Sequence, residues 1–166
     1  MCKKVVLVEG DSDELIFQKA YYVKHNRLPI QDEIEVLSVG LSFKRFLEIA
    51  VEIKMETAVL TDNDHNYINN IQRKYEEYNV YPFIKIFYDT NNDLNTLEPQ
   101  FINVNINNLE LLCDIIGIDF KKYSTSNEIS AYMENHKTDW ALKVFETEET
   151  INFPEYITKA VEWCDE

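Results

Sequence analysis

Residues 4–15 have the sequence KVVLVEGDSDEL, and residues 58–64 have the sequence AVLTDND. Each segment begins with a short run of aliphatic residues, typical of a buried strand, and continues into acidic residues. In the first segment Gly10 permits a tight turn, and Asp11 and Glu14 have the spacing of a capping box at a helix start. The pattern predicts a strand that passes directly into a helix, which is the first unit of a parallel α/β sheet.

The same alternation of strand and helix extends along the chain from residue 4 to about residue 88. Predicted strands cover residues 4–8, 34–39, 58–61 and 83–88. A helix is expected from Asp11 to about Lys24, and another carries Ile68, Ile71, Tyr75 and Tyr78 on one side. A third helix has an unbroken apolar face formed by Phe43, Phe46, Leu47, Ala50 and Val51. We therefore predict an open parallel sheet flanked by helices.

The pattern changes after Asp89. The Asn-rich stretch 90–95 is expected to be a loop, and nearly everything beyond it has helical periodicity. Helices are predicted over residues 106–116, 127–136, 139–147 and 154–164. The fold class is therefore α/β, with a core over residues 1–96 and a helical C-terminal portion over residues 97–166 packed on it.

Composition limits the function further. The chain has 166 residues, is 45% hydrophobic and has a formal net charge of −14, the wrong sign for unaided binding to nucleic acid. No apolar run approaches the roughly 20 residues of a membrane span, so no membrane association is expected. The three cysteines are widely separated and form no C-x-x-C motif, which favours idle thiols in a reducing compartment. These features predict a cytoplasmic protein.

Acidic residues gather where the predicted strands end. Glu9 follows the first strand, and Asp13 lies one helical turn later. Asp62 follows the third strand, and Asp64 faces the same way if the extended backbone persists. If these two strands are close in the sheet, four carboxylates converge at its carboxyl edge, where ligands of parallel sheets bind. Such a set, without Cys or His, suits Mg²⁺ or Mn²⁺ better than Zn²⁺, and the cation offsets the mutual repulsion.

These residues carry a resemblance. Glu9-Gly10 with Asp13, and later Asp62-Asn63-Asp64, resemble the E-G and D-x-D motifs of the TOPRIM domain. Within that superfamily the chain most resembles the OLD (overcoming lysogenization defect) family of nucleases. The matching segments are Val8–Leu15, Ser38–Gly40 with Ser42–Leu47, Ala58–Asp64, Thr96–Pro99, and Lys137 with Trp140–Leu142. They occur in order over most of the chain.

The resemblance implies a metal-dependent DNA endonuclease that hydrolyses phosphodiester bonds with two metal ions. It implies that Lys137 steadies the charged transition state and that Glu9 and Asp62 are catalytic. Carried over position by position, the metal-binding acids are Glu9, Asp13, Asp62, Asp64 and Glu98. The alternative for Glu98 is a simple helix start in front of Pro99, and for Lys137 a solvated lysine at a helix terminus.

The chain also departs from the family pattern. OLD nucleases usually carry an ATPase domain before the TOPRIM part, and no G-x-x-x-x-G-K-[ST] motif occurs here. We therefore expect an ATPase domain or a separate ATPase subunit to act as a partner, together with DNA. Weak intrinsic DNA affinity is expected from the negative charge, so that help from an attached domain or from a second protomer in a homo-oligomer is needed.

Two further interpretations stay open. The chain could be a TOPRIM-shaped binding or assembly module with little catalysis of its own. It could also be a receiver-like phosphoacceptor module, which places acids after strand one and a reactive Asp after strand three. The second fits less well, because no convincing fifth strand with a C-terminal lysine follows residue 88. A ribonuclease is a variant of the nuclease that only the substrate distinguishes.

Overall fold

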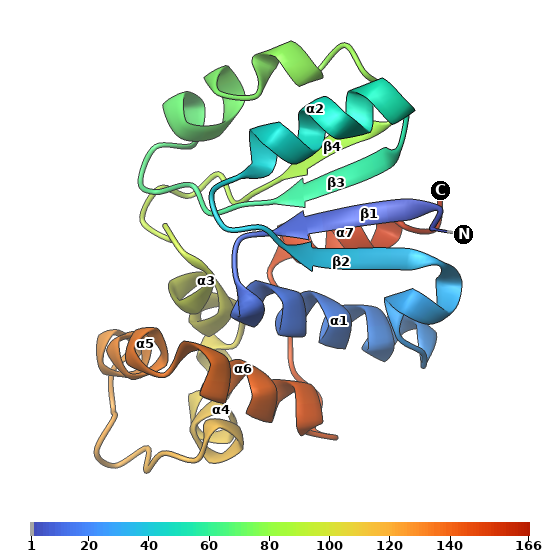
Figure 1. The fold of residues 1–166 in the computed structure, drawn as a ribbon. Helices are drawn as coiled ribbons and strands as arrows, with labels where there is room; N and C mark the ends of the chain where they lie inside the picture. Colours follow the sequence, from blue (N-terminus) through green and yellow to red (C-terminus); the bar gives the residue numbers. More distant parts are fainter. Residues whose placement is uncertain (1) are drawn as a thin grey trace.

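The computed structural model describes residues 2–166. Its centre is a parallel sheet of four strands in the order β2-β1-β3-β4 (Figure 1). The strands are β1 (Lys4–Val8), β2 (Ile34–Ser38), β3 (Glu56–Leu60) and β4 (Ile84–Phe87). β1 and β3 are adjacent, with Val6 paired to Ala58 and Leu7 to Val59. The predicted α/β class and open parallel sheet are confirmed, and β2 and β4 form its two edges.

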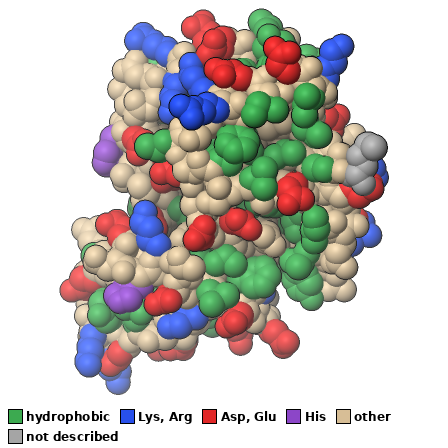
Figure 2. Space-filling model, in the orientation of Figure 1, with side chains coloured by type: hydrophobic (Ala, Val, Ile, Leu, Met, Phe, Trp, Pro, Cys, Tyr) green, Lys and Arg blue, Asp and Glu red, His purple; other side chains and the backbone are tan. Residues whose placement is uncertain are grey.

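Helices cover both faces of the sheet. α1 (Asp11–His25) and α7 (Glu155–Trp163) pack on one face, and α2 (Phe43–Ile53) lies on the other (Figure 1). Phe43, Leu47 and Ala50 of the predicted apolar face of α2 are buried. Val51 is only partly buried and Phe46 is exposed, so the buried face of α2 is narrower than its periodicity predicts. Its outer face is apolar as well, because Ile49 and Ile53 are exposed, and Figure 2 shows hydrophobic side chains over this helix.

The segment after β3 differs from the predicted regular helix. It forms η2 (Ile68–Arg73), a short π-helix, and η3 (Glu76–Tyr78), a 3₁₀ turn. Of the expected apolar residues, Ile71, Tyr75 and Tyr78 are buried against the sheet, whereas Ile68 is exposed, contrary to the prediction. Asparagine side chains explain the irregularity: the Asn66 side chain accepts from the backbone N–H of Asn69, and Asn70 Nδ2 donates to the carbonyl of Asn63. Such local bonds compete with regular helix formation.

The C-terminal region is helical. It contains α3 (Leu97–Val104), η4 (Ile106–Asn108), α4 (Leu109–Ile116), α5 (Ser126–Asn135), α6 (Lys137–Glu146) and α7. α3 was not among the predicted helices, and the predicted helix over 106–116 begins with a 3₁₀ turn. The other helices lie within two residues of their predicted bounds. Pro154, predicted as the first residue of its helix, is the N-cap of α7.

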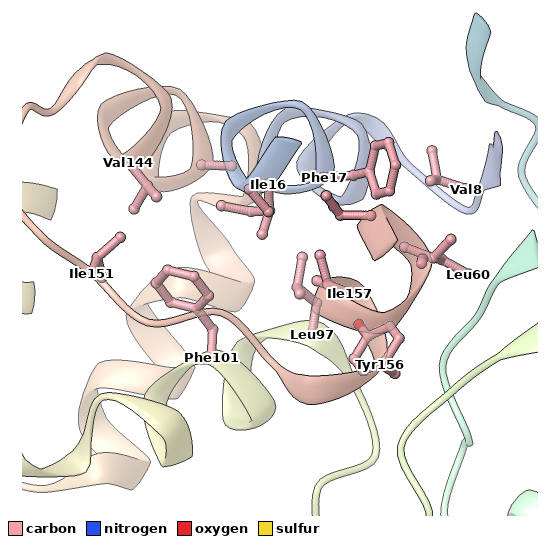
Figure 3. Close-up of a cluster of buried hydrophobic side chains, with 14 of the residues drawn as sticks. Val8, Ile16, Phe17, Leu60, Leu97, Phe101, Val144, Ile151, Tyr156 and Ile157 are labelled. Atoms are coloured by element: carbon pink, nitrogen blue, oxygen red, sulfur yellow. The ribbon is translucent and has the colours of Figure 1, made fainter. Parts of the chain in front are cut away.

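One hydrophobic core joins these helices to the sheet. Figure 3 shows Val8 and Leu60 from the strands facing Ile16 and Phe17 of α1, with Leu97 and Phe101 of α3 and Val144 of α6 around them. Tyr156 and Ile157 of α7 complete this cluster. A second core lies between the sheet and α2, around Leu7, Phe43 and Leu47. The predicted boundary near residue 96 stays a prediction, because the first core contains residues from both sides of it.

In residues 2–166, no helix is long and apolar enough to cross a membrane.

Candidate metal centre

The carboxyl edge of the sheet brings two distant acids together. Glu9 directly follows β1, and Asp62 follows β3 after Thr61. Because β1 and β3 are neighbouring parallel strands, both residues leave the sheet at the same edge. The condition under which the acids were expected to converge is therefore met.

A small cavity of about 150 Å³ lies at this edge. Five of the six predicted site residues line it, each from a different segment or turn: Glu9, Asp13, Asp62, Glu98 and Lys137. The chain around Gly10 and the first residues of α3 and α6 form the rest of its wall. Their roles as metal ligands or catalytic groups stay predictions.

The first turn of α1 positions Asp13. Gly10 is the N-cap, with extended backbone, and its N–H donates to Asp13 Oδ2 over 3.1 Å. The predicted capping box of Asp11 and Glu14 is wrong, because Asp11 is already the first helical residue and Asp13 takes the N3 position. Glu14 instead accepts from Gln18 Nε2, one turn along the helix.

Glu98 and Lys137 come from the helical C-terminal region. Glu98 lies in the first turn of α3, beside Pro99, and its side chain is only 2% exposed. Its helix-start position agrees with the alternative interpretation, yet a cap would not require burial against a cavity. Lys137 is the first residue of α6 and is exposed to solvent. A cation at a helix N-terminus is unfavourable for the helix dipole, so Lys137 does not stabilise α6 by its charge.

Burial dominates the electrostatics of the cluster. Burial raises the pKa of Asp62 to about 9, and the charges of Asp13, Glu9, Glu98 and Asp64 act in the same direction. Burial raises the pKa of Asp13 to about 7, assisted by the charge of Glu9 and opposed by the hydrogen bond from Gly10. Without a cation, Asp62 therefore retains its proton at neutral pH, and Asp13 is only partly ionised there.

Glu9 lies between opposing charges. Burial raises its pKa, the charge of Asp64 raises it further, and the ammonium groups of Lys137 and Lys74 lower it. Lys74 follows η2 and was not predicted to lie near the site. The sequence did not indicate that Lys74 lies near the site, because Lys74 falls in the irregular segment where helical periodicity fails.

Asp64 departs from the predicted geometry. The extended backbone does not persist after Asp62, because Asp64 has φ +47° and His65 has φ +64°. Asp64 is exposed and is not among the residues that line the cavity, although its charge raises the pKa of both Glu9 and Asp62. As placed, it lies at the rim of the site.

Asn63 is the reason for this turn, and sequence reasoning missed it. Its side chain is fully buried, and Nδ2 donates to the carbonyls of Asp89, Asn91 and Leu94 at 2.9–3.1 Å. Its Oδ1 accepts from the backbone N–H of His65. The residue between the two acids therefore fastens the D-x-D motif to the loop that leads into α3. The sequence carried no signal for this role, because the burial of Asn63 appears only in the folded chain.

Tyr156 of α7 is a second missed neighbour. It is 5% exposed and points into the core beside Leu97 (Figure 3). Burial raises its pKa well above the ordinary value, and the charges of Asp62 and Asp13 act in the same direction. One tyrosine among ten carried no distinguishing signal in the sequence.

The donor set fits a hard divalent cation in its chemistry. All the acids offer oxygen, and Asp62 Oδ1 is buried without a hydrogen-bond partner. Within the described residues 2–166, no group of three or more His, Cys, Asp and Glu side chains is arranged to hold a metal ion. Within that part of the chain the carboxylates therefore share one cavity without forming a ready-made metal site.

Comparisons with known proteins agree with this architecture. Residues 1–64 match the family model described as the TOPRIM domain of overcoming lysogenization defect protein-like proteins. The C-terminal region of the Burkholderia pseudomallei OLD protein superposes with a TM-score of 0.74 at 17% identity, covering 99% of this chain and 98% of that chain. No curated protein matches the sequence.

A second solved structure gives the same result. The C-terminal region of the Xanthomonas campestris pv. campestris OLD protein superposes with a TM-score of 0.69 at 19% identity, covering 97% of this chain and 91% of that chain. The resemblance to the OLD TOPRIM domain is therefore confirmed, by sequence over residues 1–64 and by fold over nearly the whole chain.

Proposed function

We propose that the chain is the catalytic region of a metal-dependent DNA endonuclease that hydrolyses phosphodiester bonds with two metal ions. The observation that carries the proposal is the shared cavity at the carboxyl edge of the sheet. There the carboxylates Glu9, Asp13, Asp62 and Glu98 lie around one space with the ammonium group of Lys137. The likeness of the fold to OLD C-terminal regions supports the same class of reaction.

The proposed ligands are Glu9, Asp13, Asp62, Asp64 and Glu98, with Mg²⁺ or Mn²⁺ as the ion. A bound divalent cation polarises the phosphate, lowers the pKa of a water molecule and neutralises the leaving oxygen. Asp62 and Asp13 must lose their protons before they can act as ligands. Their burial keeps them away from competing solvent, and Asp62 Oδ1 is free of protein hydrogen bonds.

Lys137 has a separate role. Attack on a phosphodiester places negative charge on the non-bridging oxygens, and an ammonium group beside them stabilises the transition state more than the ground state. Because Lys137 is exposed at the start of α6, its long side chain can reach a phosphate at the mouth of the cavity. DNA and an ATPase domain or subunit are the proposed partners, since the net charge of −14 disfavours DNA binding by the chain alone.

A non-catalytic binding or assembly module is the second candidate. The observation in its favour is that the described carboxylates are not arranged as a metal site. The exposed apolar side chains on α2 add a surface through which such a module could associate.

The nuclease is tested with supercoiled plasmid in Mg²⁺ or Mn²⁺. We expect the wild-type chain to nick the plasmid only with metal, Asp62→Asn to be inactive, and Lys137→Ala to be slower by about 100-fold, as for other transition-state charge stabilisers. Asp119→Asn and Lys121→Ala, exposed residues in the α4–α5 loop, serve as matched controls and should keep wild-type activity.

Equal nicking by Asp62→Asn would remove this residue from the mechanism. Metal binding without cleavage, measured over a range of protein concentrations, would instead favour the binding module.

A further inference from the structure

A second cavity of the molecule is unrelated to the predicted ligands. It has a volume of about 660 Å³ and lies between the η2–η3 segment and the edge strand β4. Four tyrosines and two cations are among its lining residues: Tyr75, Tyr78, Tyr81, Tyr88, Arg73 and Lys85. We call it the tyrosine groove.

The aromatic rings of the tyrosine groove are held in place. Tyr88 stacks on Tyr67 with a centroid distance of 6.0 Å and an interplanar angle of 24°. Its hydroxyl accepts a hydrogen bond from Gln72 Nε2 at 3.1 Å. Tyr81 packs against Phe83 with the ring centroids 5.7 Å apart. Rigid rings of this kind bind flat ligands with little loss of conformational entropy.

One polar group of the groove has no partner. Tyr75 is 2% exposed and lines the groove, yet its hydroxyl is buried without a hydrogen bond. A buried hydroxyl of this kind carries a desolvation cost unless a ligand or water satisfies it. The groove therefore offers stacking surfaces together with an unused hydrogen-bonding group.

The surroundings of the groove differ in charge from the rest of the chain. Residues 65–88 contain three basic residues, Arg73, Lys74 and Lys85, and two acidic ones, Glu76 and Glu77, whereas the whole chain has a net charge of −14. Lys74 Nζ lies 5.1 Å from the centre of the Tyr75 ring. Three basic and two acidic residues give this segment a net charge of +1, with Glu76 also lining the groove. Cations beside aromatic rings suit a phosphate backbone bearing unpaired bases.

The tyrosine groove begins close to the carboxylate cavity. Tyr88 directly follows β4 at the carboxyl edge of the sheet, the edge from which Glu9 and Asp62 also leave. Burial raises the pKa of Tyr75 to about 12, and the charge of Glu9, which lines the carboxylate cavity, acts in the same direction. A strand in the groove would therefore lead toward the predicted cleavage site.

We propose that the tyrosine groove binds single-stranded nucleic acid, stacking unpaired bases on the partly exposed rings of Tyr81 and Tyr88 while Arg73, Lys74 and Lys85 contact the backbone. Paired bases in a duplex cannot present their faces to these rings, so a duplex does not use the groove. The role of the groove in substrate delivery rests on the proposed nuclease function, whereas the binding itself does not.

The test is the binding of fluorescein-labelled dT12 to the full chain in EDTA, followed by anisotropy, so that no cleavage occurs. We expect dT12 to bind at least about tenfold more tightly than an abasic 12-mer or a 12-base-pair duplex, because each stacked base contributes a factor of this order. The slope of log K against log salt should be about −2, since three cations contact a single strand.

Variants separate stacking from charge. Tyr88→Ala and Lys85→Glu should each weaken dT12 binding by about tenfold, while Tyr88→Phe, which keeps the ring, should bind like the wild type. Tyr22→Ala and Lys121→Glu change exposed residues outside the groove and should have no effect. Circular dichroism confirms that each variant is folded.

Equal affinity for dT12 and the abasic strand, or unchanged binding by Tyr88→Ala and Lys85→Glu, would overturn the proposal. Concentration-dependent dimerisation that Lys85→Glu abolishes, without dT12 binding, would assign the groove to pairing of β4 with a second copy. The two proposals can fail independently. Binding of dT12 as expected, without plasmid nicking, would support the groove and contradict the nuclease. Plasmid nicking, with no effect of the groove variants on dT12 binding, would support the nuclease and contradict the groove.

Discussion

Asp62 combines burial, like-charged neighbours and an unpaired oxygen. Its pKa is raised to about 9, mainly by burial, whereas an unfolded aspartate has a value near 4. Between these two values the folded chain holds a proton that the unfolded chain has lost. Through this group alone, the free energy of unfolding of the metal-free chain therefore falls as pH rises from about 4 to about 9.

We predict that Asp62→Asn removes much of this pH dependence. In urea unfolding with EDTA at pH 5, 7 and 9, the free energy of unfolding of the wild type should fall by up to about 1.4 kcal/mol per pH unit through this group. Asp62→Asn should fall less steeply, because an amide does not titrate. Asp119→Asn, exposed and outside the cavity, is the control. Identical slopes for wild type and Asp62→Asn would show that Asp62 is ionised throughout.

Among the secondary-structure elements, α1 and α6 form the frame of the site. α1 carries Asp13 and α6 begins with Lys137, and both line the same cavity. Lys19 of α1 joins them, because its buried ammonium group donates to the carbonyl of Phe145 at 3.0 Å and to that of Thr147. These carbonyls end α6 and have no intrahelical partner, so a lysine satisfies both hydrogen bonding and the helix dipole.

Two other helices end in the same way. Lys143 donates to the carbonyl of Ile116 at the end of α4, and Lys4 donates to that of Trp163 at the end of α7. These lysines stabilise the packing of the helical region on the sheet. Because the ammonium groups of these lysines bind carbonyls within the fold, they do not contribute to a nucleic-acid surface.

Replacing the Lys19 ammonium group should destabilise the chain. Lys19→Met keeps a long apolar side chain but leaves two partly buried carbonyls without their donor, so we expect a loss of about 1–3 kcal/mol in the free energy of unfolding. Lys159→Met removes only the exposed ion pair with Glu155 and should cost about 0.5 kcal/mol or less. Chemical denaturation at pH 7 measures both, and equal losses would mean that the α6 carbonyls are solvated when Lys19 is removed.

For the molecule as a whole, negative charge and the proposed cation site are linked. An acidic chain gathers divalent ions weakly over its surface, whereas a specific site gives saturable stabilisation that depends on particular ligands. Four of the proposed ligands line one cavity of about 150 Å³. Replacing one of them should therefore weaken cation binding at this site and leave weak binding over the rest of the surface unchanged.

We predict that Mn²⁺ raises the melting temperature of the wild-type chain. A ligand at 100 times its dissociation constant adds about 2.7 kcal/mol to the free energy of unfolding. Asp62→Asn should show a much smaller shift, while Asp139→Asn, a change at an exposed residue of α6 that does not line the cavity, should respond like the wild type. Equal shifts in all three chains, tested by calorimetry at constant ionic strength, would indicate surface binding alone.

Local patterns predicted most of the elements because their signals are short-range. The apolar runs before Glu9 and Asp62 and the face of α2 depend on burial periods of two and 3.6 residues, which the sequence displays directly. Prediction failed where side chains bond to distant or irregular backbone. The π-helix η2 and the turn at Asp64 depend on asparagine contacts that no periodicity encodes.

The sequence alone was sufficient for the α/β class, the resemblance to the OLD TOPRIM domain, and the choice of acids that follow strands, because each rests on neighbouring residues. Strand order was not available from it, since hydrogen bonding between β1 and β3 joins segments about 50 residues apart. That pairing, and the packing of α3 and α6 beside it, place Glu98 and Lys137 in the cavity of Glu9 and Asp62. The bonds of Asn63 to the loop before α3 turn Asp64 outward, and the η2–η3 segment beside β4 forms the tyrosine groove. Such long-range contacts, unlike local propensities, exist only in the folded chain.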